Sequence, residues 1–532
     1  MEGGENVSRL LVRYRSQTSQ HLVAQASACS LGFSRGNRYT KQVPSRRSFL
    51  AAAPALIGLT AKAEKRIDGQ FVNDGFPLGH RLRDHSSFSA VKRTEKIPIV
   101  IVGGGIAGLT AGWRLHKKGF QDFVILEMEP EPGGNSRWGE NEITAYPWAA
   151  HYVPVPGPHE TLARELFEDL GVFKDGKWDE RRLCFSPQER LFMHGRWQEG
   201  IEPEVASTDR DREDYRRFQA IIDERRASGE FTIPMQRGVK PSPLDKMSMQ
   251  QWMETNRFRS PNLNWYVNYA CRDDYGALAG DTSAWAGIHY FASREPEEKG
   301  PLVWPEGNGW IVRQLVARLK PFIHTNSPVY RISGRHVYTE AVEYLADRII
   351  FAAPTFLAPY IIEGAQPPGF VYSPWLTANL TLDRLPSEDS AWDNVIYDSP
   401  ALGYVVATHM SLKSQIDRTV WTFYWALAHK PPDEMRRMLL EKDWMYWREA
   451  ILHDLSRAHP NIRDCVSRID IMRFGHAMRR PVPGFLNERE LRSNNGALRY
   501  ANGDLSGFSI FEEAQFGGVT AAERALKDIG RA

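Results

Sequence analysis

The amino-acid sequence predicts an α/β protein in which a dinucleotide-binding domain of the Rossmann type is interleaved with an α+β substrate domain. Three observations predict this class. A glycine-rich turn follows an apolar strand near residue 100, an acidic residue ends the next apolar strand, and further strand–turn–helix segments recur as far as the C-terminus.

The composition suits such a protein and excludes other classes. The chain has 532 residues, of which 42% are hydrophobic and 25% charged, enough for more than one lobe. The formal net charge of +2 gives no reason to expect nucleic acid as a partner. No apolar run reaches the roughly 18 residues of a membrane helix. The four cysteines show no metal-binding spacing, so no metal site is expected.

The N-terminus is typical of a targeting signal. Arg46 and Arg47 precede a mildly apolar stretch, 51–60, and an Ala–Lys–Ala sequence that ends at Ala63. This pattern predicts a twin-arginine signal, with the twin-arginine translocase as a partner and the periplasm as the location. The mature protein should begin near Glu64. Residues 1–44 are either an extension, the result of an early start codon, or an organellar transit peptide.

The first glycine-rich turn fits a dinucleotide. The apolar run 97–102 predicts a buried parallel strand, and Gly103, Gly105 and Gly108 then fill the pattern G-x-G-x-x-G. These glycines permit a tight turn, close approach of a pyrophosphate and packing of helix on strand. Ile106 and Ala107 open a helix whose N–H groups face phosphates. Glu127 lies 24 residues after Gly103 and is expected to bind ribose hydroxyls.

Later segments identify a family resemblance. A second glycine pair lies in 131–137, and glycine turns or strands follow at 305–315, 327–332, 346–354, 500–504 and 511–522. Together, in this order, they resemble the flavin-containing amine oxidase and phytoene desaturase superfamily. The resemblance implies FAD in a Rossmann-like domain of the GR2 type, bound by both ends of the chain. No cysteine follows Cys465, so the FAD is expected to be non-covalent.

The resemblance also implies where FAD is held and how the chain is divided. The implied residues are Gly133, Gly134, Asn135 and Arg137 beside the diphosphate, Val329 at the adenine, Gly503 and Asp504 at the ribityl phosphate, and Gln515, in a helix start at 515–518, at the flavin ring. The expected order is a leader at 1–63, an N-terminal arm at 64–96, FAD-binding segments at 97–157, 301–360 and 471–532, a helical substrate or cap region at 158–300, and a β-rich substrate region at 361–470. Strands are expected at 375–382, 404–408 and 420–425, and one helix at 432–458.

Three segments are candidates for the reacting face. In 146–153, His151 and Tyr152 would stand beside the flavin, where His151 either bonds flavin or substrate or is a structural histidine. Segments 271–275 and 281–285, which ends at Trp285, either line the pocket or supply helix caps and surface charges. In 474–484, His476 and Arg479 could reach the substrate.

One departure from the family bears on the reaction. Relatives carry a lysine on a substrate-domain strand beside flavin N5, but no lysine occurs between Lys320 and Lys413. We expect an enzyme, an FAD-dependent oxidoreductase that transfers a hydride from an amine or other C–H donor to flavin N5. A quinone, another carrier or oxygen would accept the electrons. The alternatives are a desaturase or isomerase acting on an apolar molecule, and a non-catalytic FAD-binding redox partner.

Overall fold

The computed structural model describes residues 65–72, 75–84, 88, 91, 93–235, 240–294, 300–387, 390–413, 415–487 and 496–531. The arginine pair of the predicted signal lies outside the described residues, so export stays a prediction. Within the unit Glu64–Ala532, two sheets and a helical region surround one cavity.

The first sheet is the predicted Rossmann-like sheet, and it has seven strands. Its parallel strands, in spatial order, are β12 (Ile323–His324), β3 (Phe123–Leu126), β2 (Arg93–Val102), β15 (Val342–Phe351) and β21 (Leu498–Tyr500). The antiparallel β14 (His336–Tyr338) and β13 (Arg331–Ser333) continue the sheet beyond β15. Strands from both ends of the chain therefore meet here, because β21 pairs with β15, which pairs with β2.

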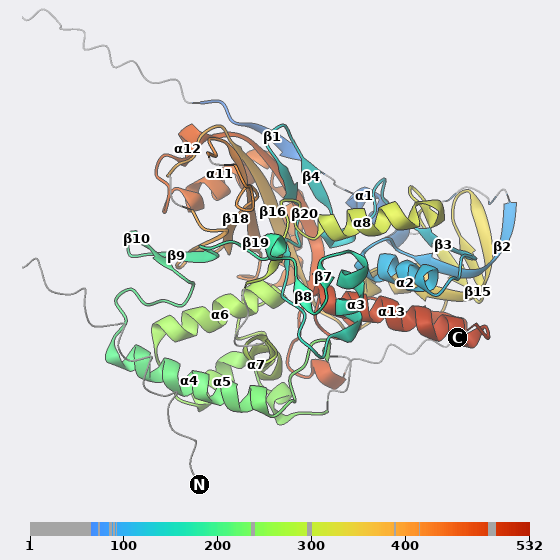
Figure 1. Ribbon diagram of the computed structural model, residues 1–532, viewed down its shortest axis with the longest axis horizontal. Coiled ribbons are helices and arrows are strands. Elements are labelled where there is room, and N and C mark those ends of the chain that lie inside the picture. The colour runs from blue at the N-terminus through green and yellow to red at the C-terminus, as the bar shows by residue number, and fades with distance from the viewer. Residues whose placement is uncertain are drawn as a thin grey trace, which may run out of the picture. The chain divides into compact units, whose positions relative to one another are not determined.

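Helices cover one face of this sheet. They are α2 (Ile106–Lys117), α3 (Thr161–Asp169), α8 (Gly309–Leu319) and α13 (Phe511–Asp528). Their apolar side chains share one buried cluster with Ile99, Ile101 and Ile125 of the sheet. Figure 1 shows the C-terminal α13 running alongside α2.

The second sheet has eight strands and mixed direction. Its spatial order is β1 (Asp68–Phe71), β20 (Val466–Arg479), β16 (Tyr372–Leu382), β19 (Thr419–Ala426), β18 (Gly403–Val406), β17 (Asp393–Ile396), β9 (Glu189–Met193) and β10 (Arg196–Glu199). The three strands predicted near 375–382, 404–408 and 420–425 are confirmed. Sequence reasoning missed that β1 of the N-terminal arm and β9–β10 of the helical region join this sheet. It also placed a domain boundary inside β20.

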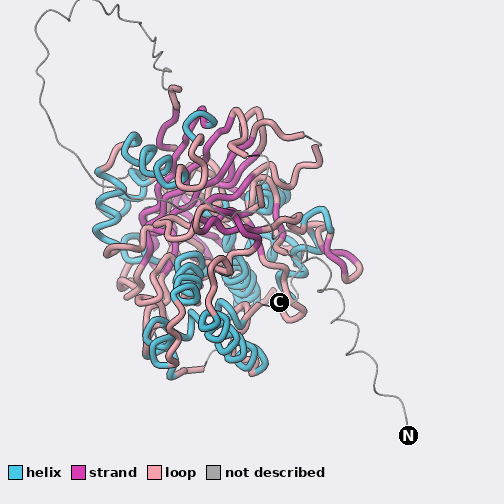
Figure 2. The backbone as a smooth tube through the Cα atoms, turned by 90° about the vertical axis from the view of Figure 1, so that its left-hand side faces the viewer, coloured by secondary structure: helices cyan, strands magenta, loops and turns pink. Residues whose placement is uncertain are grey.

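Helices pack on both sides of the second sheet. On one side, α10 (Pro432–Glu441), α11 (Trp444–Leu455) and α12 (Ile462–Cys465) cover a core that contains Trp447. The single helix predicted at 432–458 is wrong, since the Asp443 side chain accepts a hydrogen bond from the Tyr446 N–H (2.8 Å) and begins a new helix. The helical region contributes α4 (Asp209–Ala227), α5 (Met249–Thr255), α6 (Pro261–Tyr275) and α7 (Ala284–Ala292). Figure 2 shows these helices below the strands.

Short elements complete the described chain. They are α1 (Phe76–Arg83), α9 (Ala358–Ile361), and the paired strands β4 (Trp138–Glu140) with β5 (Ala145–Pro147), β6 (Tyr152–Val153) with β11 (Leu302–Val303), and β7 (Phe173–Lys174) with β8 (Lys177–Trp178). No helix in the described part of the chain has both the length and the hydrophobicity needed to cross a membrane.

Candidate functional site

The glycine-rich turn at 103–105 and the glycine pair at 133–134 lie together, and we call them the cradle. Gly103 has a φ of +105°, which favours glycine, and the Gly104 N–H donates to Glu127 Oε2 (2.7 Å). The Gly133 N–H donates to the Gly104 carbonyl (2.9 Å). The second glycine pair is therefore bonded directly to the first turn.

The cradle fits a diphosphate. A Cβ added at Gly105 would meet no atom within 4 Å, so the space in front of this residue is open. Gly105 begins α2 with extended backbone and no side-chain cap, which leaves N–H groups of the first turn for an anion. By contrast, a Cβ at Gly108 would collide with the Gly103 carbonyl. Gly108 is thus required by packing, and Gly105 leaves room for a ligand.

Glu127 is placed for a ribose. Its buried carboxylate accepts one backbone N–H at each oxygen, from Gly104 and from Glu129 (2.8 Å). Burial raises the pKa of Glu127, and these two hydrogen bonds oppose the rise. Each oxygen keeps a second lone pair for a hydroxyl. Val329 is buried nearby in the core of the sheet, but it precedes β13 and does not belong to a strand as predicted.

A cavity of about 160 Å³ continues from this cradle. Asn135, next to the second glycine pair, lines it and is held by two hydrogen bonds. Its side-chain Nδ2 donates to the Ala477 carbonyl (2.8 Å), and its backbone carbonyl accepts the Ala150 N–H (3.0 Å). Ala149, Ala150 and Thr377 form the wall at this end. The Thr377 hydroxyl donates to the Trp148 carbonyl (2.6 Å), so this side chain is held within the wall.

Aromatic rings surround His151 in the middle of the cavity. Its ring centroid lies 5.0 Å from that of Tyr424 on β19 and 5.3 Å from that of Tyr152 on β6. His151 Nδ1 is 2.9 Å from the Ala149 carbonyl and donates to it, which leaves the Nε2 lone pair free of that bond. Burial lowers the pKa of His151 to about 4, so the ring is neutral at neutral pH.

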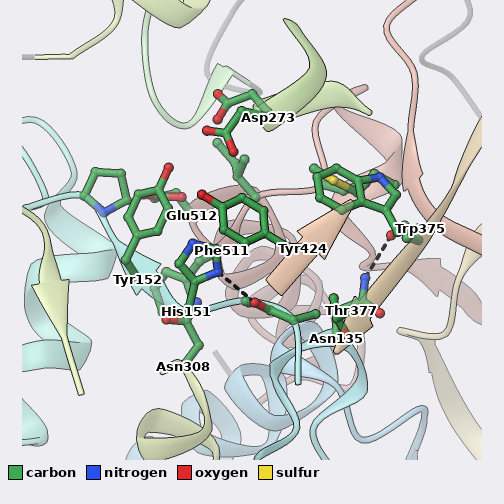
Figure 3. A pocket seen from close by; sticks show the side chains of 18 of the residues that line it. Asn135, His151, Tyr152, Asp273, Asn308, Trp375, Thr377, Tyr424, Phe511 and Glu512 are labelled. Atoms are coloured by element: carbon green, nitrogen blue, oxygen red, sulfur yellow. Dashed lines mark hydrogen bonds between the residues drawn. The ribbon is translucent and has the colours of Figure 1, made fainter. Parts of the chain in front are cut away.

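Carboxylates dominate the far end. In Figure 3, Asp273 lies on the opposite side of the rings of Tyr152 and Tyr424 from Asn135 and Thr377. The charged residues that line the cavity are Asp273, Asp274, Glu512 and Arg294. Arg294 Nη2 is paired with Asp274 (3.1 Å). Among the residues that the structure describes, none donates a hydrogen bond to the Asp273 carboxylate.

Asn308 and Trp375 bring buried polar atoms to the cavity. Asn308 is 2% exposed and Trp375 is 8% exposed, and both line the cavity. Asn308 Oδ1 and Trp375 Nε1 have no hydrogen-bond partner in the described part of the chain. Buried polar atoms are rarely left unpaired, so these two atoms indicate a polar ligand.

Several predicted site residues lie elsewhere. Trp285 is fully buried in the helical region, stacked near Phe508, and its Nε1 donates to Glu230 (3.0 Å). His476 stacks on Phe356, with ring centroids 4.5 Å apart, away from the cavity. The structure therefore brings His151 and Tyr152 to the cavity, but neither Trp285 nor His476.

The C-terminal segment also differs from expectation. The predicted helix start at 515–518 is wrong, because α13 begins at Phe511, and Ser509, Ile510 and Phe511 line the cavity instead. Gln515 is buried and donates to the Leu162 carbonyl (3.1 Å).

Other predicted residues serve local structure in this chain. Arg137 Nε donates to the Gly134 carbonyl (3.1 Å), within the cradle. The Asp504 carboxylate accepts from the Thr355 N–H (3.0 Å) and the Tyr372 hydroxyl (2.9 Å), which ties the turn at Gly503 to the segment after β15 and to β16. Arg479 Nη1 donates to the Asp504 carbonyl (2.7 Å).

Sequence reasoning missed several cavity residues, four of which lie in segments that it recognised. Asn308, Trp375, Tyr424 and Glu512 all stand inside segments that it recognised as turns, strands or helix starts. Trp375 and Tyr424 are on neighbouring strands, in sequences that alternate too little to show which face is buried. By contrast, the predicted segment 271–275 does reach the cavity, through Asp273 and Asp274.

Comparisons with known proteins agree with this geometry. Residues 101–170 match a family model described as an NAD(P)-binding Rossmann-like domain. The Baeyer-Villiger monooxygenase peniC of Penicillium patulum is 46% identical over 127 residues, which are 24% of this chain and 19% of that protein. Baeyer-Villiger monooxygenase 4 of Dietzia sp. (strain D5) is 29% identical over 127 residues, 22% of this chain and 20% of that protein. The match thus spans about a fifth of the length of these curated relatives.

Solved structures resemble a larger part of the chain. A double mutant of putrescine oxidase gives a TM-score of 0.64 at 15% identity, and covers 82% of this chain and 100% of that one. Cyclohexylamine oxidase from Brevibacterium oxydans gives 0.62 at 15% identity, with 82% and 100% covered. A fatty acid isomerase from P. acnes gives 0.59 at 16% identity, with 80% and 98% covered. The predicted fold, a Rossmann-like domain within the architecture of the amine oxidases, is confirmed.

Proposed function

We propose that this protein is an FAD-dependent oxidoreductase that oxidises a cationic amine. The observation that carries the proposal is the cavity, which continues from a dinucleotide cradle. It has aromatic walls and a carboxylate, Asp273, to which none of the described residues donates a hydrogen bond. Three carboxylates and one guanidinium line it, so a positive ligand is favoured over a neutral or negative one. The rings of Tyr152 and Tyr424 add cation–π attraction for an ammonium group.

Different residues along the cavity would hold FAD and the substrate. Gly105 and the first turn of α2 would hold the diphosphate of FAD, and Glu127 its ribose. The small side chains of Ala149 and Ala150 leave space for a ring system beside Asn135. When bound there, FAD would supply the acceptor for a hydride from the carbon next to nitrogen. His151, Tyr152 and Tyr424 would hold the substrate against that end and exclude water.

The apolar alternative is less well supported. A desaturase or isomerase substrate would have to bury its hydrocarbon against Asp273 without satisfying that carboxylate, which costs free energy. The likeness to the fatty acid isomerase extends to the fold only.

Anaerobic titration tests the proposal. Purified FAD-containing protein is mixed with benzylamine, putrescine or an amino acid, and the visible absorbance of the flavin is followed. Benzyl alcohol is the matched uncharged control, and an unsaturated fatty acid tests the alternative. We expect bleaching with an amine only. Bleaching by the fatty acid and by no amine would show that the substrate class is wrong, and no bleaching by any compound would favour a redox partner without catalysis.

A further inference from the structure

The end of α6 holds Asp273 in an unfavourable position. The carboxylate lies in the last turn of this helix, where the helix dipole disfavours negative charge, and Asp274 adds a second negative charge beside it. A Cβ at Gly276 would clash with the side chains of Ser373 and Trp375, and Ser373 Oγ donates to the Gly276 carbonyl (2.6 Å). The helix end is therefore pinned to β16, and Asp273 cannot withdraw from the cavity.

Further acidic side chains act on Asp273. Glu189 on β9 is paired in register with Asp393 on β17, and like charges directly opposite each other destabilise a sheet. Burial raises the pKa of Glu189, and the negative charge of the exposed Glu202 raises it further. The charged and titratable groups that act on Asp273 are Arg272 and Asp274 on α6, Arg294 after α7, Glu189, Asp393, and the hydroxyls of Tyr152, Tyr269, Tyr290 and Tyr424.

The surroundings of Asp273 raise the pKa of its carboxyl group. Burial and the charge of Asp274 raise the pKa of Asp273 to about 7, and Arg294 opposes the rise. The carboxyl group therefore accepts a proton readily near neutral pH.

We propose that Asp273 pairs with the ammonium group of the incoming substrate and takes its proton, so that neutral amine passes between Tyr152 and Tyr424 toward the cradle end of the cavity. This inference rests on the proposed function. One N–H bond of the ammonium breaks and one O–H bond forms on Asp273, and no electron moves. The transfer is favourable because a buried ion pair is replaced by two neutral groups. The proton stays on Asp273 while the amine is bound.

The arrangement explains why a carboxylate that receives no hydrogen bond from the described part of the chain lies on the far side of the rings from Asn135 and Thr377. Amines are protonated at neutral pH, and the carbon next to an ammonium is a poor hydride donor. A proton acceptor at the far end of the cavity would let the amine reach the other end without its charge. His151, which is neutral, could accept a hydrogen bond there at Nε2.

Calorimetry tests the inference without turnover. The ligand is α,α-dimethylbenzylamine, which has no hydrogen on the carbon next to nitrogen, and 2-phenyl-2-propanol is its uncharged control. Titrations at pH 8 in buffers of different ionisation enthalpy count the protons released. Wild type should release almost none, because the proton stays on Asp273. Asp273→Asn should release close to one proton per amine and bind more weakly, and Asp273→Glu should behave like wild type.

Kinetics gives a second readout. At saturating benzylamine, the rate of flavin reduction in wild type should be constant from pH 7 to 9. In Asp273→Asn, the second-order rate constant for reduction should fall about 100-fold at pH 7.5 and rise toward the pKa of the free amine. Asp209→Asn, whose side chain is fully exposed, is the charge-matched control and should equal wild type.

The outcomes separate the two proposals. If no amine reduces the flavin, the proposed function is wrong, and calorimetry still decides on Asp273. If amines reduce it but Asp273→Asn releases no proton and keeps the wild-type pH profile, the role of Asp273 is wrong. Folding is checked by thermal unfolding. Because the pKa of Asp273 is above its unfolded value, its ionisation costs stability as pH rises, and Asp273→Asn should raise Tm more at pH 8 than at pH 5.

Discussion

Single glycines decide how much room the cradle keeps. Gly105 faces open space, and Gly108 faces the Gly103 carbonyl, although both belong to one sequence motif. The motif therefore combines a position that a ligand needs with a position that the protein needs. The structure separates these two roles, which the spacing of glycines alone does not.

Gly105→Val should lose FAD and keep its fold. The added side chain would enter the path of the diphosphate, while its Cβ meets no protein atom within 4 Å. We expect binding weaker by at least about two decades, measured by the flavin absorbance of purified protein and by titration with FAD. Gly369→Val is the control, since Gly369 is exposed and also faces open space. Full flavin content in Gly105→Val would contradict the placement of the diphosphate.

Two buried carboxylates show the same difference between a ligand position and a structural position. The Glu127 carboxylate keeps lone pairs for a ligand, whereas that of Asp504 accepts bonds from Thr355 and Tyr372 within the protein. Residue type and local motif suggested similar roles for both. Only the partners of each carboxylate distinguish a binding group from a structural one.

At the scale of elements, two helix N-termini converge on the site. α2 begins at the cradle, and α13 begins at the cavity, and neither has a side-chain cap. Gly518 lets them approach, because a Cβ there would collide with the Ala107 carbonyl and the Thr110 hydroxyl. The glycine pair at 517–518 therefore serves helix packing rather than contact with the flavin ring.

Gly518→Ala should separate α2 from α13. We expect a cost of about 1–3 kcal/mol from overpacking, seen as a lower Tm, together with weaker FAD binding. Gly79→Ala is the matched control, since Gly79 lies in the helix α1 with no atom near its missing Cβ, and alanine there should not lower Tm. An unchanged Tm in Gly518→Ala would show that the helices do not depend on this contact.

At the scale of the whole molecule, the charges around the cavity come from three distant segments. Asp273 and Asp274 lie on α6, Arg294 follows α7, and Glu512 lies on α13. The absence of lysine between Lys320 and Lys413 leaves Arg294 as the cation that lines the cavity, and it is paired with Asp274. A protonated His151 could have supplied a second positive charge, but burial keeps it neutral.

Reduced protein should therefore react slowly with oxygen. Among the described residues that line the cavity, the cation is Arg294, which is paired with Asp274, so none of them offers a positive charge to a developing anion at the cradle end. Removing one such stabilising group commonly costs about 10²–10³ in rate. Stopped-flow reoxidation after photoreduction should be at least about tenfold slower with oxygen than with a quinone. His151→Ala should leave the oxygen rate unchanged at neutral pH, because the ring carries no charge. Rapid peroxide formation that depends on His151 would contradict this account.

The sequence by itself determined the Rossmann-like domain and its cradle. These features depend on short-range patterns, namely Gly103 to Gly108, the apolar run before them and Glu127 after them. It also pointed to His151, Tyr152 and the segment around Asp273 as candidates for the cavity.

Only the tertiary structure decided which candidates meet. Trp285 and Asp273 lie 12 residues apart in neighbouring helices, yet one is packed in a core and the other faces the cavity. The strands β1, β9 and β10 were unforeseen. β1 pairs with β20 and β9 with β17, which lie far along the chain, and β10 joins the sheet through its hairpin with β9. Such pairings, and the partners of a buried carboxylate, depend on contacts between distant segments. Local periodicity does not carry that information.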